Sequence, residues 1–358
     1  GSTREINVKN LSGTFLNGSV NASGSIELPG EGASSESTKL NLAVTVKKLN
    51  LYELLRKYIP AVRSTQGLVE TSMKVTGTFG EPNFEGKGRI APLRYRGWML
   101  PMIDVQFRGT PEEIVVNEAK ALLKNGTLKG YSRFYKTDGE WCANFNLIGD
   151  RLDLRQLGAY LPEEFRSRFG GIANFSMKGD GKISNITASG EFSAPWMRVK
   201  GIKFENVKAP FFVANNYMMM EDLNATTNKG TLTGGLGYNL HSSEWGGNLT
   251  VMSADLKTLA KQFAPKLQGE ISGTGDLTIR GVGMTGREST AYAGGALILR
   301  NGEITSFDVL EAAKKFTGGK PLRFKTVQST FTYDGGDLTI LPGSQATAPE
   351  GDPVYQYA

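Results

Sequence analysis

The chain contains one cysteine and one histidine in 358 residues. Because Cys142 has no second thiol to join, the sequence excludes an internal disulfide and a metal site built from several thiolates. His241 lies in a polar, turn-like stretch and has no histidine partner, so we interpret it as a surface residue rather than a base or a ligand. We therefore expect no metal and no cofactor.

The sequence also lacks the motifs of common catalytic sites. It has no Walker loop, HExxH zinc motif or GxSxG nucleophile elbow. Gly273-Thr274-Gly275 resembles part of a dinucleotide fingerprint, but we predict a strand where that fingerprint requires a helix. The pair Glu112-Glu113 follows a proline in a predicted turn, and we interpret it as solvated. We do not expect an enzyme.

No run of about 18 apolar residues occurs, so the sequence predicts no helix that spans a membrane. The formal net charge of +6 favours anionic surfaces only weakly, and we assign most of it to solvated Lys and Arg on outward strand faces. We expect no nucleic-acid partner. Gly1-Ser2 resembles a tag-cleavage scar and the chain begins within its pattern, so we expect a fragment of a longer protein.

Glycine, in contrast, is abundant at 45 residues, and Asn, Ser and Thr are frequent, which is typical of a sheet with many tight turns. The chain also repeats itself about every hundred residues. Five residues of the first copy recur in the second, and a looser third copy begins at Gly269: Gly67, Ser72, Met73, Lys74 and Gly77 become Gly171, Ser176, Met177, Lys178 and Gly181. Repetition predicts serial units that stack on a continuous core rather than one enclosed site.

Each unit begins with a predicted hairpin turn and an alternating strand. The turns fall at Asn17-Gly18, Asn125-Gly126 and Lys229-Gly230, and Asn-Gly supplies the positive φ angles that a tight hairpin requires. The spacing of apolar residues then changes to that of a short amphipathic helix. Each helix has a predicted N-cap and ends at a proline, namely Asn50 and Pro60, Asp153 and Pro162, and Asp255 and Pro265.

A second alternating strand follows each helix, with apolar residues on one face and polar residues on the other. The three units keep the same register, so we predict that the apolar residues form one continuous face. The candidate lining residues are Val69, Met73, Val75, Phe79, Phe175, Met177, Leu277 and Ile279. The alternative for the same residues is packing inside a closed core.

The third unit departs from this pattern. We predict a loop over 282–292, a strand over 295–299, a turn at Asn301-Gly302 and a short helix capped by Asp308. The chain is divided into a β-rich repeat 1 (1–117), repeat 2 (118–222), a partial repeat 3 (223–284) and a C-terminal region (285–358). The predicted fold is mainly β, an elongated and curved, taco-like sheet groove with one short amphipathic helix in each repeat.

The order of these motifs resembles the AsmA-like family, and most closely its TamB-type branch, the inner-membrane subunits of translocation and assembly modules. One part of the resemblance is the sequence that leads into each helix: Leu49-Asn50-Leu51, Leu152-Asp153-Leu154 and Ala254-Asp255-Leu256. The other part is the order of C-terminal segments: Gly295–Gly302, Phe307–Leu310, Phe331–Gly335 and Leu338. On this resemblance, 285–358 corresponds to a truncated AsmA-like C-terminal region.

The resemblance implies a bridge-like lipid transfer protein in the periplasm of a diderm bacterium. Such a protein is held in the inner membrane by an N-terminal anchor absent from this chain and meets a partner protein of the outer membrane. Its apolar β-groove holds phospholipid acyl chains for transport between the two membranes, and the helices brace the sheet.

Two alternatives remain open. An open sheet has unpaired edges, so the chain can instead be a scaffold for outer-membrane protein assembly that pairs its edge strand with client or partner strands. A surface β-solenoid adhesin fits less well, because such chains have shorter rungs and no capped helix in each repeat.

Overall fold

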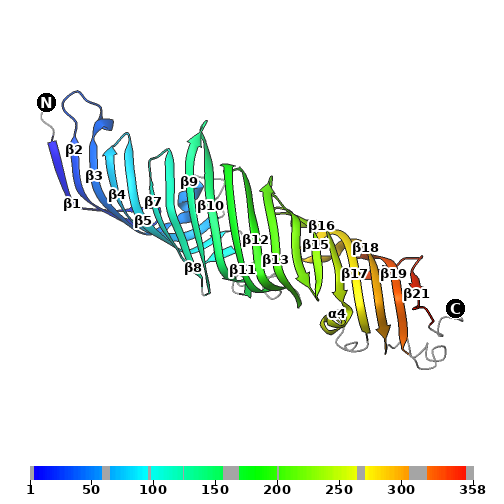
Figure 1. The fold of residues 1–358 in the computed structure, drawn as a ribbon. Coiled ribbons are helices and arrows are strands. Elements are labelled where there is room, and N and C mark those ends of the chain that lie inside the picture. The colour runs from blue at the N-terminus through cyan, green and yellow to red at the C-terminus, as the bar shows by residue number, and fades with distance from the viewer. Residues whose placement is uncertain are drawn as a thin grey trace. The chain divides into compact units, whose positions relative to one another are not determined.

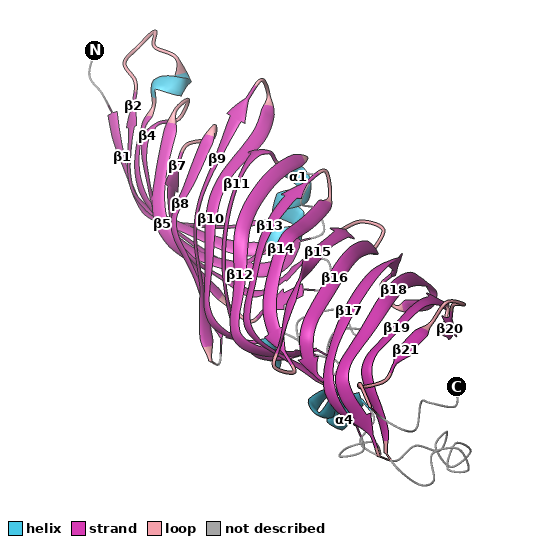
Figure 2. Cartoon of the chain, turned by 45° about the vertical axis from the view of Figure 1, so that its right-hand side comes forward, coloured by secondary structure: helices cyan, strands magenta, loops and turns pink. Residues whose placement is uncertain are grey.

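The computed structural model describes residues 4–58, 65–95, 98–123, 125–155, 169–199, 201–263, 271–305 and 321–351. Within these ranges, 21 strands form one antiparallel sheet, accompanied by two short α-helices and a 3-10 turn. The strands follow one another in chain order, as the colours of Figure 1 show, and helices are few (Figure 2). The predicted mainly-β fold is confirmed.

The chain divides into two compact units. Unit 1 comprises Gly1–Ser167 and Asn174–Gly190, and unit 2 comprises Arg168–Ala173 and Glu191–Ala358. Strands β11 (Phe169–Lys182) and β12 (Asn185–Val199) contribute residues to both units. The four-part division into repeats remains a prediction.

Unit 1 is built from hairpins in which each strand pairs with the next, except that the short β6 and then β7 both pair with β5. Helix α1 (Leu51–Tyr58) connects β3 to β4, and the 3-10 turn η1 (Ser35–Ser37) precedes β3. The strands are β1 (Arg4–Phe15), β2 (Gly18–Leu28), β3 (Lys39–Asn50), β4 (Thr65–Thr78), β5 (Pro82–Tyr95), β6 (Trp98–Leu100), β7 (Ile103–Gly109), β8 (Glu113–Leu123), β9 (Gly126–Thr137) and β10 (Glu140–Asp153).

Unit 2 continues the same construction, with strand paired to following strand from β13 to β19. Helix α4 (Leu256–Phe263) connects β16 to β17 and lies at the end of these strands (Figure 2). The strands are β13 (Ile202–Ala214), β14 (Tyr217–Thr227), β15 (Gly230–Asn239), β16 (Glu244–Asp255), β17 (Ile271–Met284), β18 (Arg287–Ile304), β19 (Leu322–Asp334), β20 (Asp337–Ile340) and β21 (Gln345–Thr347).

The sheet is neither closed nor strongly curled in either unit. Among the described strands of unit 1, β1 pairs with β2 alone, and in unit 2 β19 pairs onward only with the short β20 and β21. Local irregularities, such as the register shift between Val46 and Leu49, are bulges that bend a strand without closing the sheet. The curved, taco-like groove predicted from the sequence is therefore corrected to an extended open sheet that is not strongly curled.

The predicted helix starts are confirmed, and each follows a strand corner of the same design. A residue with left-handed backbone comes first, at Lys48, Arg151 and Ser253, with φ of 58°, 50° and 56°. A buried apolar residue and the capping residue follow. The Asn50 Oδ1 atom accepts hydrogen bonds from the backbone N–H groups of Tyr52 and Glu53 at 3.0 and 3.4 Å, which satisfies two donors that the helix leaves unpaired.

The other two corners use aspartate for the same purpose. Asp255 Oδ1 accepts from the backbone N–H of Thr258 at 2.8 Å, and Asp153 Oδ1 accepts from that of Arg155 at 2.9 Å. Helix α4 fills its predicted place. Residues 154–155 are helical after Asp153, and the rest of that predicted helix lies outside the described residues.

The hairpin turns predicted at Asn17-Gly18 and Lys229-Gly230 lie at the end of the strands where the helices begin. These turns are confirmed, but their glycines have a different role from the one predicted. The left-handed residues are Leu16-Asn17 and Asn228-Lys229, one position earlier than predicted. Gly18 and Gly230 are instead the first residues of strands, and a Cβ on Gly18 would lie 2.8 Å from the Leu49 Cα. The glycine therefore leaves room for the neighbouring corner.

Two predictions in the third unit are wrong. Residues 282–292 are not a loop, because β17 runs to Met284 and β18 begins at Arg287 after a two-residue turn. Asn301-Gly302 is not a turn, because both residues lie within β18. Asn301 has φ 49° and forms a bulge opposite Gly273, which mimics a turn signal in sequence. The helix predicted after Asp308 lies outside the described residues.

Few large side chains are fully buried. The buried apolar residues in the described ranges are mainly alanines and corner residues such as Leu49 and Leu152, and Phe324 is the large side chain that is fully buried. No described helix is long and apolar enough to cross a membrane.

Candidate functional site

The structure places three of the predicted lining residues of unit 1 on one face of β4. Val69, Met73 and Val75 are half-buried and alternate with exposed polar residues such as Ser72 and Lys74. Phe79 differs, because it lies just beyond the end of β4 and 67% of its surface is exposed. It is a residue of the hairpin turn rather than of the strand face.

Phe175 and Met177 lie on β11 and face the same side as the apolar residues of β10. The Phe175 ring covers Gly149, where an added Cβ would meet its Cδ1 atom at 2.5 Å, and the Phe145 ring covers Gly179 in the same way. Met177 lies between these two contact points on the same strand face and is half-buried.

Leu277 and Ile279 occupy the corresponding face of β17 in unit 2. Leu277 is paired with Val251 on one side and Leu297 on the other, and Ile279 is paired with Leu249 and Gly295. Both side chains are half-buried. The strands that carry the lining residues are thus flanked by apolar strands.

The register extends this apolar face across unit 1, well beyond the residues that the sequence singled out. One row of paired residues crosses the sheet from β1 to β10 through Met73: Leu11, Ala22, Val44, Met73, Gly86, Phe107, Val116, Ser132 and Phe145. A second row runs through Val75: Val8, Gly24, Leu42, Val75, Phe84, Gly109, Ile114, Phe134 and Ala143. We call this surface the apolar face of unit 1.

Unit 2 has an apolar face of the same kind. Its rows run through the two predicted residues, namely Ala225, Leu232, Val251, Leu277 and Leu297, and Leu223, Gly234, Leu249, Ile279, Gly295, Phe331 and Ile340. Met218 and Met220 of the Met-rich stretch point to this side, whereas Met219 and its partner Phe212 point to the other and are about two-fifths exposed. The sequence contained the signal for these strands, because Ile103, Val105 and Phe107 or Met218 and Met220 alternate as clearly as the predicted set.

The helices cover only one end of each apolar face. Leu51 of α1 is buried and its Cδ2 lies 3.6 Å from the position of a Cβ on Gly67, and Leu256 of α4 packs over Gly275 in the same way. Both glycines share the strand face of the lining residues. Within the described ranges no second layer of structure covers the remainder, which explains why its side chains are half-buried by one another instead of fully buried.

The opposite face is polar and carries ion pairs between neighbouring strands. One row of unit 1 alternates in sign across four strands, through Glu70, Arg89, Asp104 and Lys120. Arg89 Nε lies 2.8 Å from Asp104 Oδ1, and the hydrogen bond and charge of Asp104 raise the pKa of Arg89. The Arg89 and Asp104 side chains are about half exposed, so such a pair contributes little to stability.

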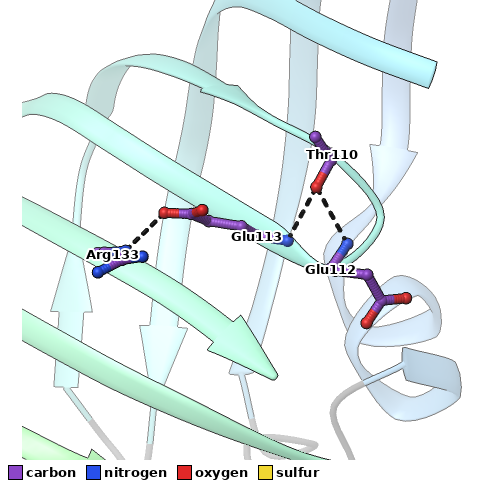
Figure 3. A network of polar contacts seen from close by, with 4 residues as sticks. All are labelled: Thr110, Glu112, Glu113 and Arg133. Carbon is purple, nitrogen blue, oxygen red and sulfur yellow. Dashed lines mark hydrogen bonds and ion pairs between the residues drawn. The ribbon is translucent and has the colours of Figure 1, made fainter. Parts of the chain in front are cut away.

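Figure 3 shows a second example beside the turn between β7 and β8. Arg133 Nε donates to Glu113 Oε1 at 2.5 Å, which raises the pKa of Arg133. Glu112 lies 3.2 Å from Lys136, which is paired with Trp141 on the apolar side of β9 and β10. The Thr110 hydroxyl oxygen accepts the backbone N–H groups of Glu112 and Glu113 at 3.3 and 3.2 Å. On the sequence interpretation both glutamates are solvated. In the structure each has its own ion-pair partner, Glu112 in the turn and Glu113 at the start of β8.

The polar face of unit 1 also contains a shallow depression of about 620 Å³. Its charged and polar lining comes from β3, β4, β5, β7 and β8 and consists largely of the alternating row and its neighbours: Thr45, Lys47, Ser72, Lys87, Gln106 and Glu118 join Glu70, Arg89, Asp104 and Lys120. Acids and bases face each other across it, so it resembles a solvated sheet surface more than a binding site.

Two carboxylates have a lowered pKa, and both are structural. The backbone N–H of Ser253 donates to Asp276 Oδ1 at 2.8 Å, and this bond, helped by Arg300, lowers the pKa of Asp276. The Thr258 hydroxyl lowers the pKa of Asp255 in the N-cap of α4. Each carboxylate holds a corner of unit 2 in place.

Acid should weaken these corners. A carboxylate whose folded-state pKa lies below its ordinary value of 3.8 contributes stability above that pH and loses it as the pH falls through the folded-state pKa. Asp276→Asn should flatten the fall in melting temperature below about pH 4, because asparagine still accepts the bond, as Asn174 does from Arg151 N–H at 2.8 Å. Thermal melts followed by circular dichroism test this. Asp138→Asn, in an exposed turn, is the control, and equal slopes in both variants would contradict the assignment.

The described residues offer little reactive chemistry. They contain no group of three or more His, Cys, Asp or Glu side chains placed to hold a metal ion. Cys142 is buried, and His241 is exposed in a turn where its backbone N–H donates to Asn239 Oδ1 at 2.8 Å. What the arrangement can do is hold something apolar against a wide, uncovered face.

Comparisons with protein-family models, with curated proteins and with solved structures gave no match for this chain.

Proposed function

We propose that this chain holds the acyl chains of phospholipids against its apolar face and lets them move along the sheet. The observation that supports this most directly is the size of that face. The apolar face crosses the strands from β1 to β10 in unit 1 and from β14 to β19 in unit 2. The described residues leave it uncovered, apart from the end of each unit where a helix packs on it. A sheet with one apolar face must bury it against something.

Acyl chains suit this surface energetically. Removing apolar area from water is worth about 25 cal/mol per Å², or roughly 0.8 kcal/mol for each CH₂ group. Together, the rows through Met73 and Val75 present an apolar side chain at strand after strand, because a glycine or serine in one row has an apolar neighbour in the other, as Gly86 has Phe84. A lipid that shifts by one strand therefore exchanges one apolar contact for a similar one, and no position along the face is a deep energy minimum.

We further propose that the chain is part of an AsmA-like, TamB-type periplasmic bridge, as its sequence motifs suggest. In that setting the open sheet is a shallow groove, an N-terminal anchor outside this chain holds the protein in the inner membrane, and an outer-membrane partner receives the lipid. The repeated corner at Lys48, Arg151 and Ser253 supports a serial construction in which one design of strand and helix is used again along the chain.

Native mass spectrometry of the detergent-free protein, followed by lipid extraction, tests the proposal. We expect diacyl phospholipid to remain bound after purification, or to be taken up from vesicles of phosphatidylethanolamine and phosphatidylglycerol. A folded protein that carries no lipid under either condition would overturn the proposal.

A scaffold for outer-membrane proteins is the second candidate, and the edge of β1 favours it. Among the described strands β1 pairs on one side only, and its Ile6, Leu11 and Phe15 side chains are 47%, 61% and 43% exposed. An unpaired edge of this kind can accept a client strand. This function predicts that extended peptides from outer-membrane barrels protect the β1 amides from hydrogen exchange while the protein carries no lipid.

A further inference from the structure

The two rims of the sheet in unit 1 differ in charge. Strands in an antiparallel sheet begin and end at two opposite rims, and α1 and the corners lie at one of them. We call this the helix rim and the other the turn rim. The turn rim consists of the hairpin turns 29–38, 79–81, 110–112 and 138–139.

The turn rim is acidic. Every charged residue in those four turns is a carboxylate, and all five are exposed: Glu31, Glu36, Glu81, Glu112 and Asp138. The turns themselves contain no lysine or arginine, but Lys39 and Lys136 lie at the ends of the strands beside them and pair with Glu27 and Glu112 at 3.2 Å. An anionic group that approaches this rim is repelled over a Debye length, which is about 8 Å at physiological ionic strength.

The helix rim is basic. Its exposed residues include two left-handed corner residues, a strand-end residue and two helical residues, namely Lys48, Arg151, Arg94, Arg56 and Arg155. The helical pair is informative, because α1 packs on the apolar side of the sheet through Leu51. Arg56, with 60% of its side chain exposed, is therefore carried on the same side as the apolar face.

Two acids of the helix rim have assigned partners, and a third, Asp150, is exposed beside the Arg151 corner. Glu53 lies 3.4 Å from Arg56, and Asp153 accepts hydrogen bonds from Asn125 Nδ2 at 3.0 Å and from the Arg155 backbone. In unit 2 the same kind of corner also has exposed bases beside it, with Lys229 74% exposed and Lys257 on α4. Each unit thus presents bases beside the corners where its helices begin, and of these Arg56 and Lys229 are paired with Glu53 and Asp255.

We infer that the helix rim of unit 1 binds the phosphate of anionic phospholipids whose acyl chains lie on the apolar face, so that the lipids are held with their headgroups toward that rim. This inference rests on the proposed function and adds the charge and the orientation of the lipid. Each Lys or Arg near an anionic lipid surface strengthens binding by about fivefold. Repulsion by the acidic turn rim also favours a lipid whose anionic headgroup points to the helix rim. A lipid of no net charge gains less from both rims.

Competition between two lipids tests the inference. The protein is incubated with vesicles of equal parts phosphatidylglycerol and phosphatidylethanolamine, repurified, and its bound lipid quantified by mass spectrometry. We expect bound phosphatidylglycerol to exceed phosphatidylethanolamine by about tenfold at low salt, and the ratio to fall toward one in Lys48→Glu/Arg151→Glu/Arg155→Glu. The control Lys74→Glu/Lys87→Glu/Lys178→Glu makes the same change of charge on the polar face, away from the rim, and should keep the ratio.

The outcomes separate the two proposals. Bound lipid in equal amounts in the native protein, or a ratio that the rim variant leaves unchanged, would overturn the inference and leave the lipid-binding function standing. Failure to bind either lipid would overturn the proposed function itself. A ratio that falls equally in both variants would mean that net charge, and not the rim, selects the lipid, which also overturns the inference.

Discussion

Replacing apolar-face residues by arginine should remove bound lipid without unfolding the protein. In Met73→Arg/Met177→Arg/Leu277→Arg, a guanidinium lies where acyl chains are expected, and a charged group loses hydration there with no partner to compensate. If each arginine displaces about three CH₂ groups of lipid, each site loses roughly 2 kcal/mol of binding, which is more than tenfold. Native mass spectrometry and lipid extraction measure the loss.

The control uses the same strands and the same charge. Ser72→Arg/Ser176→Arg/Thr278→Arg adds three arginines at neighbouring positions that are exposed on the polar face, where Lys74, Lys178 and Arg280 already lie. Lipid should remain bound in this variant. Both variants should melt within a few degrees of the parent. In the apolar-face variant the replaced residues are half-buried on an open face, and an arginine stem restores much of the apolar contact. In the control the replaced residues are exposed. If the apolar-face variant unfolds and the control does not, the face is a closed core.

Much of this arrangement is visible in the sequence because it depends on local chemistry. The helix starts at Leu51 and Leu256 follow from a capping side chain and a change of apolar spacing, both contained in about ten residues. The face of Met73 and Val75 follows from strict alternation, because a strand with a period of two has only two ways to orient. The pairing register between strands extends the same face to strands such as β7 and β9, which carry none of the predicted lining residues.

Other features depend on contacts between strands and could not be read locally. The sequence Asn301-Gly302 is typical of a turn. The pairing of β17 with β18 nevertheless continues past these residues, because Asn301 forms a bulge opposite Gly273 and both have positive φ angles. Phe79 continues the alternation of β4, but the strand ends one residue earlier, where its backbone N–H bonds to Thr38 O at 2.8 Å. Bulges such as the one between Val46 and Leu49 are likewise visible only in the pairing of neighbouring strands.

The repeated glycine at the corner gives the largest expected loss of stability. Gly18, Gly126 and Gly230 each begin a strand beside a corner, and a Cβ on them would lie 2.8, 2.5 and 2.5 Å from backbone atoms of Leu49, Arg151 and Met252. Backbone cannot move aside as a flexible side chain can. Gly18→Ala should therefore force β2 away from the corner that supports the Asn50 cap, and destabilise unit 1 by about 2–4 kcal/mol.

Gly13→Ala is the matched control, because Gly13 lies in the same hairpin and a Cβ there meets nothing within 4 Å. That substitution should leave stability unchanged or raise it slightly, since alanine has less conformational freedom to lose on folding. Urea denaturation followed by circular dichroism measures both variants. Equal stability of the two would show that the corner can shift to accept a side chain. A selective loss in Gly18→Ala would show that close contact between a strand start and its corner holds each repeat together, and with it the alignment of the apolar face.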